Sequence, residues 1–296
     1  EGGSTIVPVE ESNSYGDWLP SAVVRFEPRR DVVLRAAYSR SLGRPNYAAL
    51  SPGGSLEFED GSTPGTFEGA FATGNPKLDP YRSDNLDASA EWYFGRGGLI
   101  AVAAFGKWIA NPIFNRTTTQ TGVSFANRQF EILQTTQPFN AENGRILGIE
   151  AAYQQQFSFL PGWLSGFGIE LNGTLVDSEL TLPDGRKTTF PGQSDFLYGA
   201  QLFYQSDRIE ASIAFHNTGK HLIVAGEEPF EDQFNDDLRR LDAKLSIKAN
   251  ENLTFFVEGQ NLTDEPTRQF QWDRPDWLIQ NERYGRTYYA GVSARL

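Results

Sequence analysis

The last stretch of the chain, Tyr284–Leu296, reads YGRTYYAGVSARL and decides the fold. Every second residue in its second half is apolar or aromatic: Tyr288, Ala290, Val292, Ala294 and Leu296. The positions between them hold small or polar side chains, and a period of two indicates a β-strand with two different faces. Membrane barrels use strands of about ten residues that turn an apolar face outward and a polar face inward. The stretch therefore predicts one long strand of such a barrel.

The same alternation returns along the whole chain. It covers segments near residues 18–27, 32–39, 86–94, 99–109, 149–156, 167–175, 196–205, 209–216, 241–248 and 253–260. With the terminal stretch, these segments predict about eleven antiparallel strands. The predicted fold class is all-β, an up-and-down transmembrane β-barrel segment.

The connections between the predicted strands alternate in length. Short turns lie near residues 28–31, 95–98, 160–164, 206–208 and 249–252. Long connections lie near residues 42–82, 111–144, 179–193, 218–237 and 263–282, and only the second shows a candidate hairpin, around Val123–Leu133. Outer-membrane barrels have short periplasmic turns and long extracellular loops. The order of lengths therefore favours a membrane barrel over a soluble sandwich.

Aromatic residues gather at the predicted strand ends beside the short turns: Trp92, Tyr93, Phe94, Phe157, Phe159, Trp163 and Tyr204. Girdles of aromatic residues at the membrane interface explain this placement. The alternative is ordinary core packing in a soluble β domain. The alternation of short and long connections favours the membrane interpretation.

The composition excludes several other classes of protein. The chain has 296 residues, no Cys and a net charge of −12, which excludes disulfide frameworks and argues against a nucleic-acid partner. No run of about 18 apolar residues is present, so the sequence contains no candidate transmembrane helix. The chain lacks Met and opens without the basic start and apolar core of a signal peptide. We therefore expect a fragment or processed segment of a longer protein.

Motifs for catalysis or cofactor binding do not appear. Without a Walker loop, nucleophile elbow or paired-histidine zinc motif, we expect no enzyme, no cofactor and no metal site. His216 and His221 are five residues apart, which would place them on opposite faces of one strand. The acidic stretch 227–237 offers oxygen ligands for Ca²⁺, although a solvated loop is the simpler interpretation.

Glutamates recur at the inward positions of successive predicted strands: Glu150, Glu170, Glu210 and Glu258. Paired carboxylates are also the catalytic groups of glycoside hydrolases, and that alternative stays open at this point. Repetition from strand to strand is what the polar wall of a barrel lumen requires. We therefore interpret these residues as lumen-facing.

Several blocks of sequence resemble the C-terminal barrel half of TonB-dependent outer-membrane receptors. They keep their order along nearly the whole chain: Asp17–Ser21, Leu34–Arg40, Arg44–Tyr47, Gly74–Leu78, Ser83–Asp87, Gly259–Glu265 and Tyr284–Gly291. The resemblance implies a barrel of about 22 strands with an N-terminal plug. It also implies import of a scarce nutrient across the outer membrane of a Gram-negative bacterium, with energy supplied by TonB.

The chain departs from this family pattern in three respects. About half of the strands are present, the plug and the TonB-contacting segment are absent, and the last residue is Leu296 where such strands more often end in Phe. An odd number of strands does not close a bacterial barrel. We therefore expect residues 1–17 to be a lead-in or extracellular loop and residues 18–296 to be the C-terminal part of the barrel. The expected partners are outer-membrane lipid, the TonB complex through the absent part, and a small-molecule ligand.

The imported compound should meet the long connections first. The last of them carries Trp272, Asp273, Arg274 and Trp277, and we add Arg44 and Asn46 from the first as candidate ligand contacts. An aromatic face beside carboxylate and guanidinium groups suits an oligosaccharide, whereas an anionic siderophore or other iron complex would favour a basic mouth. Alternatively, the two Trp residues only pack the loop onto the barrel rim. The alternative function is a soluble secreted β-rich domain that binds or hydrolyses carbohydrate, and solubility without detergent would distinguish it.

Overall fold

Residues 14–226 and 228–295 are described by the computed structural model. Most of the predicted lead-in at residues 1–17, and the terminal Leu296, lie outside these ranges. One large sheet has the strand order β1-β2-β5-β6-β9-β10-β12-β13-β16-β17-β20, with the short β11 paired to β10. Its eleven main strands are β1 (Ser21–Arg29), β2 (Val32–Gly43), β5 (Tyr81–Phe94), β6 (Gly98–Ala110), β9 (Asn143–Gln156), β10 (Phe167–Thr181), β12 (Phe196–Gln205), β13 (Ile209–Thr218), β16 (Leu238–Asn250), β17 (Leu253–Gln260) and β20 (Thr287–Ala294).

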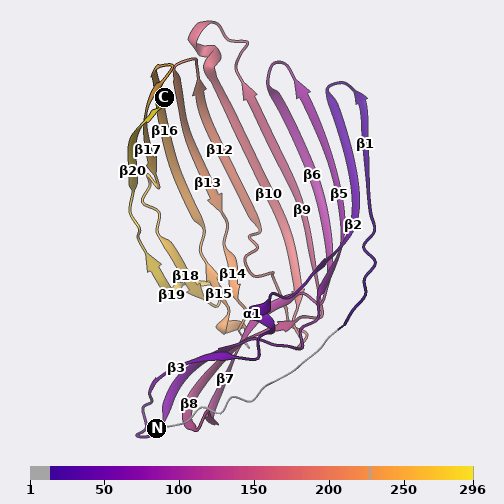
Figure 1. Cartoon of the computed structure of the whole chain (residues 1–296), viewed down its shortest axis with the longest axis vertical. Coiled ribbons are helices and arrows are strands. Elements are labelled where there is room, and N and C mark those ends of the chain that lie inside the picture. Colours follow the sequence, from indigo (N-terminus) through magenta and orange to yellow (C-terminus); the bar gives the residue numbers. More distant parts are fainter. Residues whose placement is uncertain (1–13, 227, 296) are drawn as a thin grey trace.

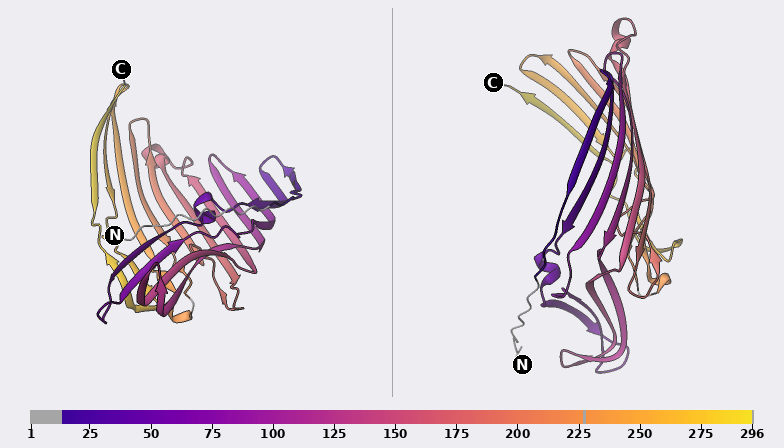
Figure 2. Two further views of the ribbon diagram at one scale, coloured as in Figure 1. Left: turned by 60° about the horizontal axis from the view of Figure 1, so that its bottom comes forward. Right: turned by 90° about the vertical axis from the view of Figure 1, so that its right-hand side faces the viewer.

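All neighbouring strands of this sheet are antiparallel and follow the order of the sequence. Every short turn lies at the upper edge in Figure 1 and every long connection at the lower edge. The sheet curves like part of a barrel wall, and Figure 1 looks into its concave side (Figure 2). The predicted eleven strands and the alternation of short and long connections are confirmed.

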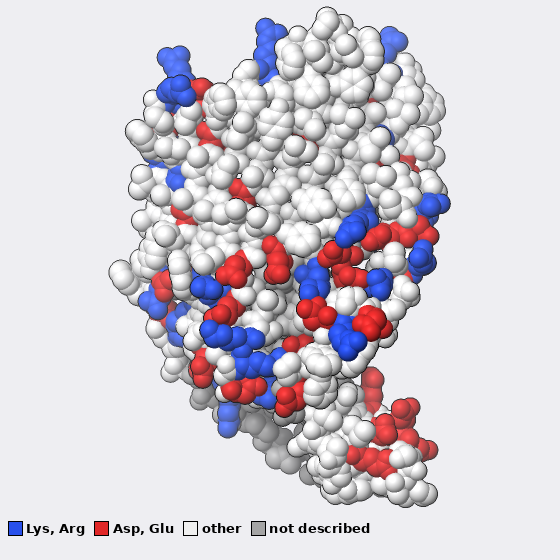
Figure 3. All heavy atoms as spheres, turned by 180° about the vertical axis from the view of Figure 1, so that it is seen from behind, with Lys and Arg blue, Asp and Glu red and all other residues white. Residues whose placement is uncertain are grey.

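Strand register produces one continuous apolar face. Leu245 on β16 lies opposite Ala211 on β13 and Val257 on β17, and Val257 lies opposite Ala290 on β20. Val257 is 53% exposed, and many other large apolar side chains on this face are exposed as well. Seen from behind, the upper part of the convex side carries few charged groups (Figure 3). An exposed apolar surface of this extent is expected where lipid, not water, is the solvent.

Several strands extend further toward the long connections than the alternation predicts. β9 begins at Asn143 rather than near 149, and β10 continues to Thr181 rather than ending near 175. The outward positions of these extensions carry polar residues, among them Arg145, Asp177 and Glu179, so the outward apolar alternation stops while the hydrogen-bonded ladder continues. The C-terminal strand is shorter than predicted and covers only Thr287–Ala294 of the stretch 284–296.

Aromatic rings from neighbouring strands contact one another in groups near the short turns. The Trp92 and Phe94 ring centroids are 5.0 Å apart, and Phe94 stacks on Tyr153 of the β9 strand at 6.3 Å. On β10, the Phe167 ring lies 5.0 Å from that of Tyr204 on β12. These rings come from neighbouring strands, as a girdle at the edge of an apolar zone requires.

The long connections hold more regular structure than the sequence pattern predicts. The first contains α1 (Tyr47–Leu50), β3 (Gly54–Asp60) and β4 (Phe67–Thr73), and the second contains β7 (Ile113–Phe125) and β8 (Arg128–Asn140). The third holds β11 (Lys187–Thr188), the fourth holds β14 (His221–Val224) and β15 (Gln233–Asn235), and the fifth holds β18 (Thr267–Gln271) and β19 (Arg274–Glu282). The hairpin expected around Val123–Leu133 is confirmed, but the other strands contradict the expectation of irregular loops.

Apart from β11, which pairs with β10, the strands of the long connections form two further sheets, of order β3-β4-β8-β7 and β14-β15-β18-β19. Each sheet joins strands from two different connections, and β4 pairs with β8 in parallel. The buried hydrophobic cluster also lies here, and it draws on β7, β10, β14 and the chain between them: Phe114, Ala141, Leu180, Leu182, Leu222 and Ala225. The long connections therefore pack as a folded unit at one edge of the sheet.

The structure also bears on the two histidines and on possible membrane-spanning helices. His216 lies on β13 in the main sheet and His221 on β14 in another, so the expectation that they share one strand is wrong. Within the described ranges, no helix is long and apolar enough to cross a membrane.

Candidate ligand-binding site

The concave face of the main sheet is polar. Glu170 on β10 lies opposite Gln154 and Gln201, and Glu258 on β17 lies opposite Lys244 on β16. These side chains alternate with the apolar residues of the convex face, and Glu150 and Glu210 share their side of the sheet. The predicted inward positions of all four glutamates are confirmed, and the carboxylates are spread along the wall rather than paired as in a glycosidase.

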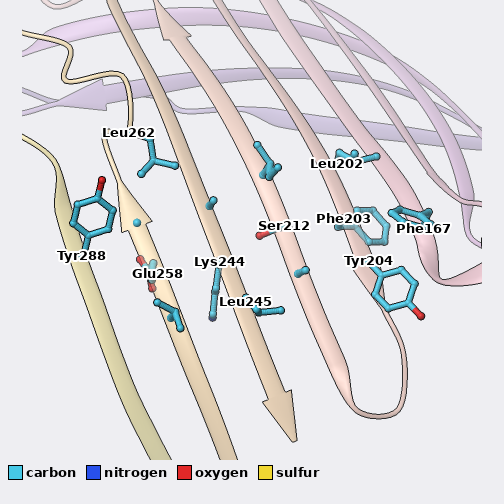
Figure 4. Close-up of a pocket in the computed structure, with 15 residues that line it drawn as sticks. Phe167, Leu202, Phe203, Tyr204, Ser212, Lys244, Leu245, Glu258, Leu262 and Tyr288 are labelled. Carbon is cyan, nitrogen blue, oxygen red and sulfur yellow. The ribbon is translucent and has the colours of Figure 1, made fainter. Parts of the chain in front are cut away.

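An apolar hollow of about 410 Å³ lies on the other face, over β12 to β20 (Figure 4). It forms because the small residues Ala243 and Gly259 lie between Ile213 and Tyr288 in the register. Leu202, Tyr204 and Leu245 complete its apolar wall. The hollow is part of the outward apolar surface and offers little to a polar ligand.

The tip of the β18–β19 hairpin brings four of the six predicted ligand contacts together. Gln271 pairs with Arg274, so Trp272 and Asp273 form a two-residue turn with φ of 56° and 49°. Both angles fall in the left-handed region, which Trp rarely adopts. Hairpin turns that need positive φ at both positions usually carry Asn and Gly. The Trp272 backbone is therefore strained at an exposed tip.

The two Trp rings of this tip lie beside charged groups. Their centroids are 5.3 Å apart with an interplanar angle of 50°, and each residue is 43% exposed. The Arg274 guanidinium lies 4.8 Å from the centre of the Trp277 ring, and its Nη2 donates to Asp276 at 3.3 Å. The tip therefore presents aromatic rings, a guanidinium group and carboxylates within the short segment Trp272–Trp277.

Contacts from other connections hold the tip in place. The Trp272 N–H donates to the Asp232 carbonyl oxygen at 2.8 Å, and the buried Asp232 carboxylate accepts from Arg186 at 2.8 Å. Lys220 forms an ion pair with Asp273. Because Arg186, Lys220 and Asp232 come from two other long connections, the tip is positioned by the folded unit and not by its own strands alone.

A polar cavity of about 430 Å³ adjoins the tip. Lys220 and Asp273 form part of its wall, together with His221, Gln193 and Asp195. The His221 Nε2 accepts from the Asn235 amide at 3.0 Å, which fixes the ring against β15. Sequence reasoning missed Lys220, His221, Gln193 and Asp195 as neighbours of the tip, because they come from connections far from it in sequence.

At the base of the hairpin, Glu282 accepts hydrogen bonds from the Tyr284 hydroxyl and the Gln280 amide. The first of these is the main cause of a pKa lowered below the usual range of a glutamate. The base of β19 therefore carries a charged carboxylate at neutral pH.

Arg44 and Asn46 lie apart from the hairpin tip, in the chain that leads into α1. The Asn46 side chain caps that helix by accepting from the Ala49 N–H at 2.7 Å. The Arg44 guanidinium lies 5.5 Å from the centre of the Tyr15 ring. Asn46 thus has a local structural role, and the structure does not bring the two residues into one site with Trp272 and Trp277. Among the described residues, no group of three or more potential ligands is arranged to hold a metal ion.

The sequence and the fold are similar to those of known proteins over most of the chain. The family model described as TonB dependent receptor-like, beta-barrel matches residues 2–262. No curated protein matches the sequence. A variant of the ferric enterobactin receptor from Pseudomonas aeruginosa has a TM-score of 0.62 and 17% identity, over 94% of this chain and 40% of that chain.

Two other solved structures are similar to the same degree. The siderophore receptor PirA from Acinetobacter baumannii has a TM-score of 0.63 and 15% identity, over 94% of this chain and 41% of that chain. The copper transporter OprC has a TM-score of 0.62 and 16% identity, over 93% and 39%. Identities this low show the shared fold alone, and the chain spans about 40% of the length of the receptors it matches.

Proposed function

The chain belongs to the TonB-dependent receptor β-barrel family, and on this basis we propose that it forms part of an outer-membrane importer whose substrate is an oligosaccharide. The parent receptor lies in the outer membrane of a Gram-negative bacterium, takes up its ligand at the long connections, and draws energy from the TonB complex. The exposed apolar convex face supports this location, because a secreted soluble domain would cover such a surface.

The observation that carries the substrate class is the strained aromatic tip. A sugar stacks its C–H face on an aromatic ring while its hydroxyl groups bond to neighbouring polar groups. Trp272 and Trp277 supply two exposed rings, and Asp273 and Arg274 supply an acceptor and a donor within the same turn. A negatively charged iron complex would instead favour a basic mouth, whereas the chain as a whole has a net charge of −12.

Uptake of labelled oligosaccharides by cells that express the full-length receptor tests this proposal. We expect the double variant Trp272→Ala, Trp277→Ala to bind about tenfold more weakly, since each stacking contact contributes roughly 0.5–1.5 kcal/mol. Trp163→Ala is the control, because Trp163 is also an exposed tryptophan, 68% accessible, but lies at the opposite edge of the sheet. Unchanged sugar affinity in a well-assembled double variant would refute the tip as the binding site. Growth that depends on the receptor only under iron limitation would refute the substrate class.

A further inference from the structure

The sheet β3-β4-β8-β7 has two different faces. One face is aromatic and packed: the ring of Phe58 lies 5.3 Å from that of Phe67 and 6.4 Å from that of the fully buried Phe130, between centroids. The other face carries short or polar side chains, most of which are exposed. This second face is therefore open to a ligand.

Strand register places small residues along the middle of the open face. On β4, Ala72 lies opposite Ser55 on β3 and Thr136 on β8, and Ala70, two residues before it, lies opposite Glu57 on β3. Because the alanines are shorter than the side chains on either side, a groove follows β4. We name it the β4 groove, with Ala70 and Ala72 as its floor and the side chains of β3 and β8 as its walls.

The end of the β4 groove beside α1 is a hollow of about 730 Å³ with no charged residue in its wall. Amide and hydroxyl groups line it, from Asn46, Ser51, Ser55, Asn115 and Thr136. The Asn46 side-chain oxygen caps α1, which leaves its amide N–H groups for a ligand. Among the described residues, the side chains of Ser55 and Asn115 have no hydrogen-bond partner within the protein. This end therefore offers hydrogen-bond donors and acceptors without charge.

The other end of the groove is a hollow of about 460 Å³ with carboxylates in its wall, from Glu57, Glu59 and Glu68. Ile132, which is 37% exposed, adds apolar surface. Glu59 lies directly opposite Glu68, and like charges in such positions repel each other. Seen from behind, acidic groups gather on the unit that extends beyond the main sheet (Figure 3). This end of the groove accepts hydrogen bonds and repels anions.

We propose that the β4 groove binds an extended, uncharged oligosaccharide whose chain lies along β4. This inference rests on the proposed function, because it gives the same class of substrate a second binding surface apart from the aromatic tip. Sugar hydroxyl groups both donate and accept, so they match the amides and hydroxyls at one end and donate to the carboxylates at the other. From Ser55 to Glu59, β3 extends about 13 Å, which is longer than a single sugar ring.

The charge and position of the groove exclude other ligands. A sugar chain that carries carboxylates, or an anionic iron complex, would be repelled by the three glutamates. An extended peptide usually binds by adding a strand to the edge of a sheet. The groove lies on the face of the sheet, along a strand that is already paired with β3 and β8, so it offers a peptide no free backbone edge.

The test measures binding to the purified full-length receptor by calorimetry, in a detergent without a sugar headgroup. The probes are linear neutral hexasaccharides of glucose, galactose, mannose or xylose, and the anionic hexasaccharide of galacturonic acid. The groove variant carries Ala70→Ile and Ala72→Ile, which fill the floor with a residue that favours strands. The matched control carries Thr119→Ile and Thr121→Ile, which add the same side chain to the same face on β7, outside the groove.

We expect at least one neutral hexasaccharide to bind the wild type and the control equally, and to bind the groove variant at least about tenfold more weakly. Failure of every neutral hexasaccharide to bind, or equal affinity of the wild type and the groove variant, would overturn the inference. So would binding of a basic peptide in the groove without binding of a neutral sugar. The single variant Ala72→Ile is measured as well, so that poor assembly of the double variant does not remove the test.

Selectivity against anions has a readout of its own. The galacturonate hexasaccharide should bind the wild type at least about tenfold more weakly than the neutral ligand, and should gain affinity as salt is added, because salt screens the repulsion. The double variant Glu59→Gln, Glu68→Gln should narrow this difference. Tighter binding of the anionic hexasaccharide to the wild type would contradict the assignment of the groove to an uncharged chain.

Binding and import together separate this inference from the proposed function. A receptor that binds a neutral hexasaccharide in the β4 groove but imports no oligosaccharide contradicts only the proposed function. A receptor whose sugar uptake falls in the variant Trp272→Ala, Trp277→Ala, while the groove variant binds sugar like the wild type, contradicts only the inference about the groove.

Discussion

Adjacent residues on one strand of this protein meet different solvents. On β16, Leu245 faces outward, opposite Ala211 and Val257, and Ser246 faces inward, opposite Glu210 and Phe256. An arginine on the lipid-facing side of a barrel costs roughly 2–4 kcal/mol at the membrane midplane, whereas the polar lumen accepts a charge readily. The identity of a residue therefore matters less for assembly than whether its position in the strand is odd or even.

We expect Leu245→Arg to reduce assembly of the full-length receptor strongly and Ser246→Arg to leave it near the wild-type level, since the new guanidinium of the second variant lies beside Glu210. The shift in gel mobility between folded and heat-denatured barrels measures the assembled fraction in outer-membrane preparations. The two substitutions introduce the same side chain into neighbouring positions, so each serves as the control for the other. Equal assembly of both variants would contradict the assignment of the two faces.

At the scale of elements, a single carboxylate fastens the β3–β4 hairpin to β8. Glu131 accepts from the Ser62 N–H at 3.0 Å, the Ser62 hydroxyl at 2.6 Å, the Thr63 N–H at 2.7 Å and the Thr66 hydroxyl at 2.8 Å. These bonds, led by those from Ser62, lower the pKa of Glu131 from 4.5 to about 2. Because the pKa is lowered on folding, the contribution of Glu131 to stability is complete above pH 4.5 and is lost as the pH falls toward 2.

Glu131→Gln should therefore loosen the hairpin turn at neutral pH, because an amide has only one acceptor oxygen and no charge. We expect faster hydrogen exchange of the backbone amides at residues 62–66 in this variant at pH 7, and a smaller difference from the wild type at pH 2, where roughly half of the Glu131 carboxyl groups are protonated. Glu57→Gln, on the same hairpin, is the control for a general loss of negative charge. Unaltered exchange at residues 62–66 at pH 7 would show that the carboxylate does not fasten the hairpin.

For the whole molecule, the proposed location in the outer membrane places the two edges of the main sheet in different compartments. The turns with Arg96 and Asp207 lie at the upper edge of Figure 1, whereas Asp184 and Glu228 belong to long connections at the lower edge. All four residues are exposed, and the absence of Cys from the sequence provides a clean background. Single Cys substitutions in the full-length receptor can therefore report the side of the membrane on which each edge lies.

We expect an impermeant thiol reagent to label intact cells at Cys in position 184 or 228, and to label positions 96 and 207 only after the cells are opened. The physical reason is that barrels of this class place short turns in the periplasm and long connections outside. Labelling of position 96 in intact cells would reverse the topology, and with it the compartment assigned to the aromatic tip.

The sequence by itself determined the main sheet, because the signals involved are local. Alternation with a period of two is written into each strand, and the lengths of successive connections can be counted without knowing any partner. The strand count, the order of short and long connections, the two faces and the inward glutamates were all predictable for this reason. Even the aromatic edge followed from positions beside turns, such as Trp92 and Tyr204.

Tertiary structure alone decided how the long connections fold. Phe67 pairs with Phe130 and Gln233 with Gln271, and such partners are separated by too much sequence for a local pattern to reveal them. The same physics explains the outcome for the candidate site. Trp272 and Trp277 came together because the first lies in the hairpin turn and the second on the strand that follows it. Lys220 and Asp232 reached that turn through long-range packing, and Arg44 and Asn46 did not reach it. Pairing of short strands from different loops gains stability only when all of them are folded, so their positions depend on the whole unit rather than on any one segment.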